Sequence, residues 1–241
     1  MNLKTQFYSQ FREDEILASI FNFKKQGFCI EIGAYDGVIC SNTYFFEKLG
    51  WDCLVVEPIP ELCEAIRRRR QCIVANVAIS DRNGETDFFI AEKAEILSTL
   101  ETRKEITNRI DSEGGKLKKI RVKTQTLESL LNETGFSVHI DFVSIDVEGH
   151  EFHVLQGFPF HTISPKILII EDNTTNHNLA INNYLSNFGY IRFKRTGCND
   201  WYAKSNDYSI INLFNVLVLK TRMIIAIFRQ ELKRMIQLMG K

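Results

Sequence analysis

The chain has 241 residues, of which 44% are hydrophobic and 25% charged, enough for one substantial globular core. Thirty basic and thirty acidic side chains give no net charge. The net basic charge that most often indicates nucleic-acid binding is therefore absent, and we expect no nucleic-acid partner. The sequence shows neither a secretory signal nor an apolar run of the roughly 20 residues that span a bilayer. Its six cysteines lack zinc-site spacing, which favours a reduced, cytoplasmic protein.

The first predicted elements are a helix and a strand that ends in a glycine turn. Apolar residues at helical spacing, with acidic residues in the first turn, predict a leading helix over residues 10–23. The segment GFCIEIGAYDG is then typical of a buried parallel strand that runs into a ligand-binding turn.

Strand-like and helix-like segments alternate after this turn. WDCLVVEP predicts a strand, PELCEAIRRRR a helix with proline at its start, and QCIVANVAIS another strand. We interpret the four arginines 67–70 as a solvated last turn that complements the helix dipole, rather than as a phosphate-binding patch.

The alternation is interrupted at residues 85–124, where TDFFI and KIRVKT predict a strand pair within an insertion beside the site. It resumes with helices over residues 126–131, 151–156 and 180–188, the strands IDFVSID and KILIIED, and short strands at 190–193 and 201–203. We therefore predict an α/β domain over residues 1–206, with a seven-stranded, mostly parallel sheet and helices on both faces.

Residues 207–241 follow this domain, and from residue 209 to 239 they predict an amphipathic helix. Its apolar residues recur at steps of three, four and seven, and from Lys220 onward six basic residues face only Glu231. Such a helix suits peripheral contact with the inner surface of an anionic membrane. Packing on its own domain or in a homodimer remains open.

The polar ends of the predicted strands carry the functional information. Glu31, Gly33 and Gly37 form an E-x-G-x-x-x-G turn, and Glu57 follows 20 residues beyond Gly37, where a nucleotide-binding sheet places a carboxylate for ribose hydroxyls. The acidic Glu31 and Asp36 would repel a pyrophosphate and suit a cationic ligand. A nicotinamide-dependent dehydrogenase is therefore the weaker alternative.

Together these motifs, in the order YSQFRED, EIGAYDGVICSNT, VVEPIPE, NVAISD, IDFVSIDVEGHE, IIEDN and GCNDWYAK, resemble the FkbM family of S-adenosylmethionine-dependent methyltransferases. The resemblance covers residues 8–204 and implies a Rossmann-like class I methyltransferase fold with S-adenosylmethionine as cofactor. It also implies cofactor-binding residues for each part of the cofactor: Glu31, Gly33, Tyr35, Asp36, Gly37 and Asn42 for the methionine part, with Gln10 and Asp14 closing over it; Glu57 for the ribose; and Pro58, Ile59, Asn76 and Val77 for the adenine. Asp146 is a further expected cofactor-binding residue.

Methyl transfer needs a group that takes the acceptor's proton. Asp146, Glu148 and His150 crowd the end of the fourth parallel strand, and His150 is the best candidate base because an imidazole titrates near pH 6.5. The alternative is that His150 only lines the following helix. Asp146, Glu171 and Asp172 form an oxygen-only set that could hold a divalent cation such as magnesium, or bind sugar hydroxyls instead.

We therefore expect a methyltransferase that modifies an oxygen of a sugar, a glycan or another small-molecule acceptor. N-methylation remains open. The competing hypothesis from another class is a non-catalytic scaffolding or membrane-docking protein that has kept the methyltransferase fold.

Overall fold

The computed structural model of the chain describes residues 6–92, 100, 116–136, 139–173, 179–212, 216–219, 221 and 224. The chain forms two compact units, residues 1–171 and residues 172–241. The domain boundary predicted at residues 206/207 lies inside the second unit.

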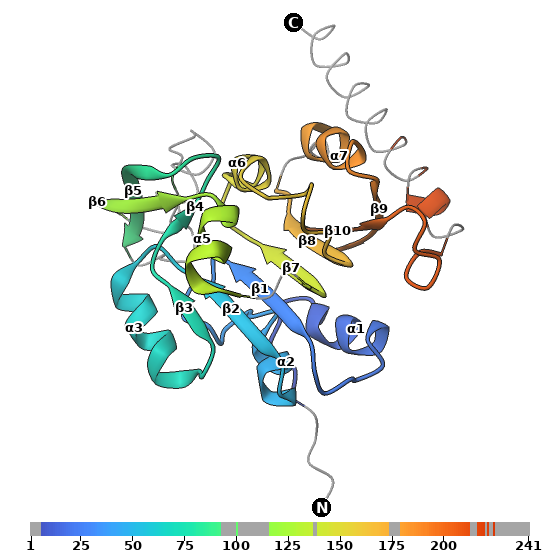
Figure 1. The fold of residues 1–241 in the computed structure, drawn as a ribbon, viewed down its shortest axis with the longest axis horizontal. Helices are drawn as coiled ribbons and strands as arrows, with labels where there is room; N and C mark the ends of the chain where they lie inside the picture. Colours follow the sequence, from blue (N-terminus) through green and yellow to red (C-terminus); the bar gives the residue numbers. More distant parts are fainter. Residues whose placement is uncertain are drawn as a thin grey trace, which may run out of the picture. The chain divides into compact units, whose positions relative to one another are not determined.

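A parallel sheet organises the first unit (Figure 1), with the strand order β3-β2-β1-β7-β8. Its strands are β1 (Phe28–Ile32), β2 (Asp52–Val56), β3 (Ile73–Ala75), β7 (Phe142–Ile145) and β8 (Ile167–Glu171). All four neighbouring pairs in this order are parallel. The central strands are nearly continuous apolar runs because both of their faces are buried.

Three helices pack on one face of this sheet: α1 (Glu13–Ile20), α2 (Tyr44–Leu49) and α3 (Pro60–Arg69). Phe21, which follows α1, and Phe46 of α2 both pack on the ring of Phe142 in β7, at centroid distances of 6.2 and 4.9 Å. Ile66 of α3 packs against Val55 of β2. These helices confirm the leading helix and the proline-initiated helix that the sequence predicts.

Two further helices of the first unit follow the insertion: α5 (Leu127–Thr134) and α6 (Glu151–Gln156). Thr126 caps α5, because its hydroxyl oxygen accepts a hydrogen bond from the Ser129 amide at 3.1 Å. Figure 1 shows α5 in front of the parallel strands.

A second, three-stranded sheet has the order β4-β6-β5, with β4 (Ala78–Ile79), β5 (Gly84–Glu92) and β6 (Lys116–Gln125). Strands β5 and β6 are antiparallel, which confirms the predicted strand pair. The run QCIVANVAIS is not one strand as predicted: β3 joins the parallel sheet, whereas β4 pairs with β6. Most of the stretch between β5 and β6 lies outside the described residues.

The second unit contains α7 (Leu179–Ser186) and an antiparallel pair, β9 (Tyr190–Thr196) and β10 (Asn199–Lys204). Together, the five parallel strands and this pair are the seven strands of a mostly parallel α/β fold, as predicted. Within this unit, Ile211 and Val216 are buried. The predicted C-terminal helix is helical at residues 216–219, 221 and 224, and its remainder lies outside the described residues.

No helix in the described part of the chain combines the length and apolarity needed to cross a membrane. All six cysteines carry free thiols.

Candidate functional site

A pocket lies at the carboxyl ends of β1, β2 and β7, the three adjacent strands at the centre of the first-unit sheet. This is where open α/β sheets bind ligands. The space in and around this pocket, including solvent at its open mouth, is about 640 Å³. It brings together nine residues predicted from the sequence: Gly33, Tyr35, Glu57, Pro58, Ile59, Val77, Asp146, Glu148 and His150.

The glycine turn after β1 forms one wall of this pocket. Gly33 has a φ of +85°, and a Cβ atom built on it would lie 1.6 Å from the carbonyl oxygen of Asp146. Only glycine therefore fits between the ends of β1 and β7. The Gly33 amide donates to the carbonyl oxygen of Val56 at 3.0 Å, which also ties the turn to β2.

Glu57, directly after β2, presents its carboxylate to the pocket and is only 4% exposed. Its two oxygens accept hydrogen bonds from the backbone amides of Tyr35 and Ile59, at 3.0 and 2.9 Å. Burial raises the pKa of Glu57 to about 7, and the two amide hydrogen bonds oppose this shift. No cation contacts Glu57 among the described residues, so the carboxylate is available to hydroxyl donors.

Next to Glu57 the pocket is lined by apolar side chains, a part of the pocket that we call the apolar slot. Pro58, Ile59 and Val77 belong to it. Asn76 supports it from outside, because its side-chain amide donates to the carbonyl oxygens of Glu57 and Pro58, at 3.1 and 3.0 Å. Sequence reasoning missed the remaining slot residues: Leu62, Ala78, Ile79, Phe88 and Leu100. Several of them pack into one cluster with Ile59 and Val122, so the second sheet helps to close the slot.

Glu31 lies beneath the glycine turn rather than in the pocket. Its carboxylate accepts hydrogen bonds from the amide of Asn42, at 2.7 Å, and from the hydroxyls of Ser41 and Thr43, at 2.7 and 2.5 Å. The Asn42 side-chain amide donates to the Ser144 hydroxyl at 2.8 Å. Glu31 faces away from the pocket because Ile32, its neighbour in the strand, lines it.

Asp36 and Gly37 also have structural partners. Asp36 accepts from the amides of Val38 and Ile39 and pairs with Arg69 at 2.5 Å. The backbone hydrogen bonds and the Arg69 guanidinium lower the pKa of Asp36, although partial burial acts in the opposite direction. A Cβ atom on Gly37 would lie 2.9 Å from the Ile66 side chain, so this glycine allows close packing on α3.

The two residues predicted to close the pocket from the leading helix differ in burial. Asp14 is fully buried, and its carboxylate accepts from the Tyr8 amide at 2.5 Å and from the Ser9 hydroxyl at 2.6 Å. Gln10 is exposed. The segment before α1 runs beside the glycine turn, since Ser9 forms a parallel bridge with Cys40.

Three carboxylates gather at the ends of β7 and β8. Ligand oxygens of Asp146, Glu148 and Glu171 all lie within 4.8 Å of one another. The Asp146 residue is exposed, but protein atoms crowd its carboxyl group. The resulting desolvation and the carboxylates of Glu171 and Glu148 raise the pKa of Asp146 well above its usual value. Asp172, predicted to act with Asp146 and Glu171, forms an ion pair with Arg195 at 3.6 Å within the second unit.

His150 precedes α6, and its side chain makes no capping hydrogen bond. Instead its Nε2 lies 3.0 Å from the Ser80 hydroxyl oxygen, and its ring stacks on His153 at 4.4 Å between centroids. The Ser80 hydroxyl donates to Asp81 at 3.0 Å. A second, more polar pocket shares His150 and Leu100 with the first and is otherwise lined by residues 80–86, Thr124 and His153.

Comparison with known protein families identifies the family of this chain. A family model described as the methyltransferase FkbM domain matches residues 31–192. No curated protein matches the sequence.

Two solved structures are weakly similar to the structure of this chain. A precorrin-6y C5,15-methyltransferase from Geobacter metallireducens has 9% identity and a TM-score of 0.43, over 78% of this chain and 84% of that one. A putative sarcosine dimethylglycine methyltransferase from Galdieria sulphuraria has 11% identity and a TM-score of 0.37, over 80% and 71%. The family match, which spans the pocket and most of the parallel sheet, shows that the chain belongs to the FkbM methyltransferase family.

Proposed function

We propose that the chain is an S-adenosylmethionine-dependent O-methyltransferase that acts on a hydroxyl group of a sugar-like small molecule. The observation that carries this proposal is the Glu57 carboxylate, which faces the pocket between the glycine turn and the apolar slot. A buried carboxylate suits the two hydroxyls of a ribose, and the slot beside it suits a flat, largely apolar base.

The pocket residues fit the three parts of this cofactor. Ile59, Val77 and Phe88 would hold the adenine, Glu57 the ribose, and Gly33 with Tyr35 the methionine part. When bound, S-adenosylmethionine supplies an electrophilic methyl group. The acidic groups near the methionine end, Asp146 and Glu148, favour a cationic ligand.

Asp146 is the better placed of the two candidate bases. Its backbone lies against Gly33, on the side of the proposed methionine part, and its side chain is open to water. Its raised pKa suits a carboxylate that accepts a proton from an acceptor hydroxyl. His150 bonds to Ser80, next to Val77 and Ile79 on the adenine side of the pocket.

The carboxylate cluster also supports the choice of acceptor. Carboxylates from neighbouring strand ends can each accept hydrogen bonds from sugar hydroxyls, so Asp146, Glu148 and Glu171 suit a polyhydroxylated acceptor. The same oxygen-only set could hold magnesium.

Calorimetric titration with S-adenosylmethionine, S-adenosylhomocysteine and a nicotinamide dinucleotide tests the cofactor. We expect binding of the first two alone. Incubation with methyl-labelled S-adenosylmethionine and an extract of the host cell then identifies the acceptor and the methylated atom. If the folded chain binds neither sulfur nucleoside, the proposal fails; if it binds them but labels nothing, the scaffolding alternative is favoured.

A further inference from the structure

The last of the four arginines in RRRR differs from the other three. Arg67, Arg68 and Arg69 end helix α3 and are exposed, whereas the side chain of Arg70, which directly follows α3, is completely buried. A buried guanidinium is stable only when charged and polar partners replace its water.

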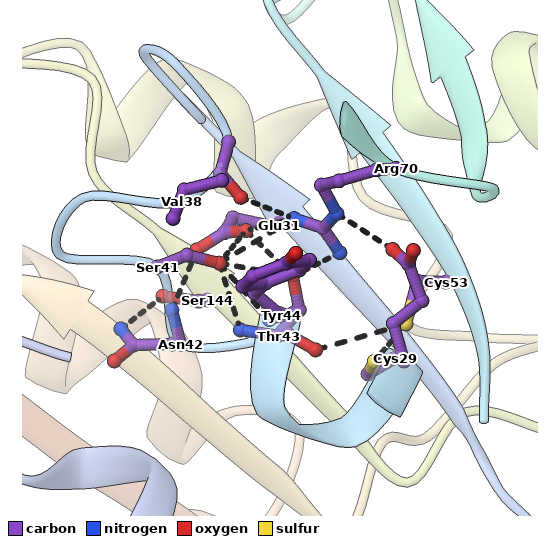
Figure 2. A network of polar contacts seen from close by, with 12 residues as sticks. Cys29, Glu31, Val38, Ser41, Asn42, Thr43, Tyr44, Cys53, Arg70 and Ser144 are labelled. Carbon is purple, nitrogen blue, oxygen red and sulfur yellow. Dashed lines mark hydrogen bonds and ion pairs between the residues drawn. The ribbon is translucent and has the colours of Figure 1, made fainter. Parts of the chain in front are cut away.

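Among the described residues, the hydrogen-bond and ion-pair partners of the Arg70 side chain all belong to the segment from Glu31 to Glu47 (Figure 2). Its Nε donates to the Glu47 carboxylate at 2.6 Å, and its Nη2 to the Thr43 hydroxyl at 3.1 Å. Its Nη1 donates to the carbonyl oxygen of Gly37 at 3.0 Å and lies 3.2 Å from the Glu31 carboxylate. The guanidinium therefore contacts this segment at its start, its middle and its end.

Glu31 links the two ends of the same segment independently. It lies in β1, and its carboxylate accepts hydrogen bonds from three successive residues just before α2, Ser41, Asn42 and Thr43. Arg70 adds a contact to the centre of the turn, because its guanidinium donates to the carbonyl oxygen of Gly37. Together the two side chains restrain the turn between β1 and α2 from below.

The restrained turn forms part of the pocket wall. Gly33 and Tyr35 line the pocket, whereas Arg70 does not. The Tyr35 amide donates to Glu57, so the shape of the turn also sets the distance between the methionine side and the ribose side of the pocket. A turn that is already held in its binding shape loses less conformational entropy when its ligand binds, so it binds the ligand more tightly.

We infer that Arg70 is a positioning residue that holds the turn from Gly33 to Thr43 in the shape that binds the amino-acid part of the cofactor. This inference rests on the proposed function. Substituting lysine keeps the charge but removes the planar fork, and one ammonium cannot replace contacts made by Nε, Nη1 and Nη2.

The test compares two ligands that differ only in the part held by the turn. S-adenosylhomocysteine contains adenine, ribose and the amino acid, whereas 5′-methylthioadenosine lacks the amino acid. For Arg70→Lys we expect calorimetry to show S-adenosylhomocysteine bound at least about tenfold more weakly and methylthioadenosine within about twofold of the wild type.

Two further variants complete the test. Arg68→Ala removes an exposed arginine of the same helix and should bind both ligands as the wild type does. Thr43→Val removes the hydroxyl that joins Arg70 to Glu31 with little change in volume, and it should reproduce the selective loss even if Arg70→Lys does not fold.

Equal weakening of both ligands, or no weakening, in variants that melt like the wild type would overturn the positioning role. A wild-type chain that binds neither ligand would instead overturn the proposed function, and this inference with it.

Discussion

The Glu57 carboxylate accepts a hydrogen bond from the Tyr35 amide at 3.0 Å, which joins the end of β2 to the glycine turn after β1. A second amide, that of Ile59, holds the other carboxylate oxygen at 2.9 Å. Two neighbouring strand ends thus fix one acidic group at the pocket.

Replacing Glu57 with alanine should weaken S-adenosylmethionine binding at least tenfold, since loss of a charge-assisted contact costs about 1.5–3 kcal/mol. The fold should survive, because Glu57 follows its strand at the pocket rather than packing in the core. Titration calorimetry with a circular dichroism control measures both effects. Unchanged affinity in a folded variant would exclude Glu57 as the ribose ligand.

Cofactor affinity should depend on pH around neutrality. Burial raises the pKa of Glu57 to about 7, and ribose hydroxyls donate best to its ionised form, so binding should release a proton. Affinity should fall by up to about tenfold per unit as pH drops below 7. Calorimetry between pH 6 and 8 measures this slope, and Glu57→Gln should flatten it. An equally steep slope in the glutamine variant would assign it to another group.

The same raised pKa has a consequence for the stability of the ligand-free protein. Since the folded value lies above that of the unfolded chain, the stabilisation is fully present below the unfolded pKa and is lost as pH rises through about 7. Glu151 is buried, and its pKa is likewise raised to about 7. Thermal melting of the apo protein should therefore show a lower Tm at pH 8 than at pH 5.5, and a bound cofactor should reduce this difference.

The strand ends could be predicted from sequence because parallel strands are nearly continuous apolar runs, and the first polar residue after each run marks the ligand side. Gly33, Glu57 and Asp146, which this rule selects, line one pocket. Glu31 does not line it, because it precedes the pocket-lining Ile32 in the strand and the two side chains face opposite sides.

Other features depend on contacts between distant segments and had no local signature. A basic last helical turn fits a solvated surface equally well, so nothing in RRRR distinguishes the buried Arg70 from its exposed neighbours. Phe88 lines the pocket because β5 packs beside Ile59, and Leu100 packs against the same cluster. The division of QCIVANVAIS between two sheets likewise follows from the pairing of β4 with β6.

Substitution of the two candidate bases should lower kcat to different extents. Asp146→Asn should lower kcat by a factor on the order of 10²–10⁴ while binding of S-adenosylhomocysteine stays nearly intact, as for loss of a general base. His150→Ala should have the smaller effect on kcat, because His150 bonds to Ser80 on the side of the pocket that we propose for the adenine. The reverse order in single-turnover measurements with the identified acceptor would make His150 the base.

A magnesium requirement can be tested at the same cluster. If Asp146, Glu148 and Glu171 bind acceptor hydroxyls directly, turnover should survive exhaustive chelation, and magnesium should not raise the Tm. If the cluster instead binds a metal ion, chelation should abolish activity, and magnesium should restore it in the wild type but not in Glu171→Gln.

Two truncations should distinguish the C-terminal residues that the fold needs from those that would bind a membrane. Ile211 and Val216 are buried, so removing everything after Asn206 should destabilise the second unit, by about 2–5 kcal/mol for each large apolar side chain lost. Truncation after Leu219 keeps both residues and should leave cofactor binding intact. If residues 220–241 dock on an anionic membrane, only the full-length chain should float with anionic liposomes; equal flotation would exclude membrane docking, and an unchanged oligomer would exclude a dimer through this helix.

The contact between Gly33 and Asp146 should make position 33 intolerant of any side chain. Gly33 has a φ of +85°, and its Cβ would lie 1.6 Å from the Asp146 carbonyl oxygen, a backbone atom that cannot move alone. Gly135 provides a matched control, because it has a φ of +64° and no atom within 4 Å of a built Cβ. Gly135→Ala should lower the free energy of unfolding only by the penalty for an alanine in the left-handed backbone region, about 1–2 kcal/mol.

Gly33→Ala should lose at least about 2 kcal/mol more than Gly135→Ala, since it adds a backbone clash to the same conformational penalty. Urea denaturation of both variants measures the difference. If Gly33→Ala still folds, S-adenosylhomocysteine affinity should fall in this variant alone, because the displaced turn carries Tyr35 and its hydrogen bond to Glu57. Equal losses of stability in the two variants would mean that backbone conformation alone, and not the close approach of β1 to β7, selects glycine at position 33.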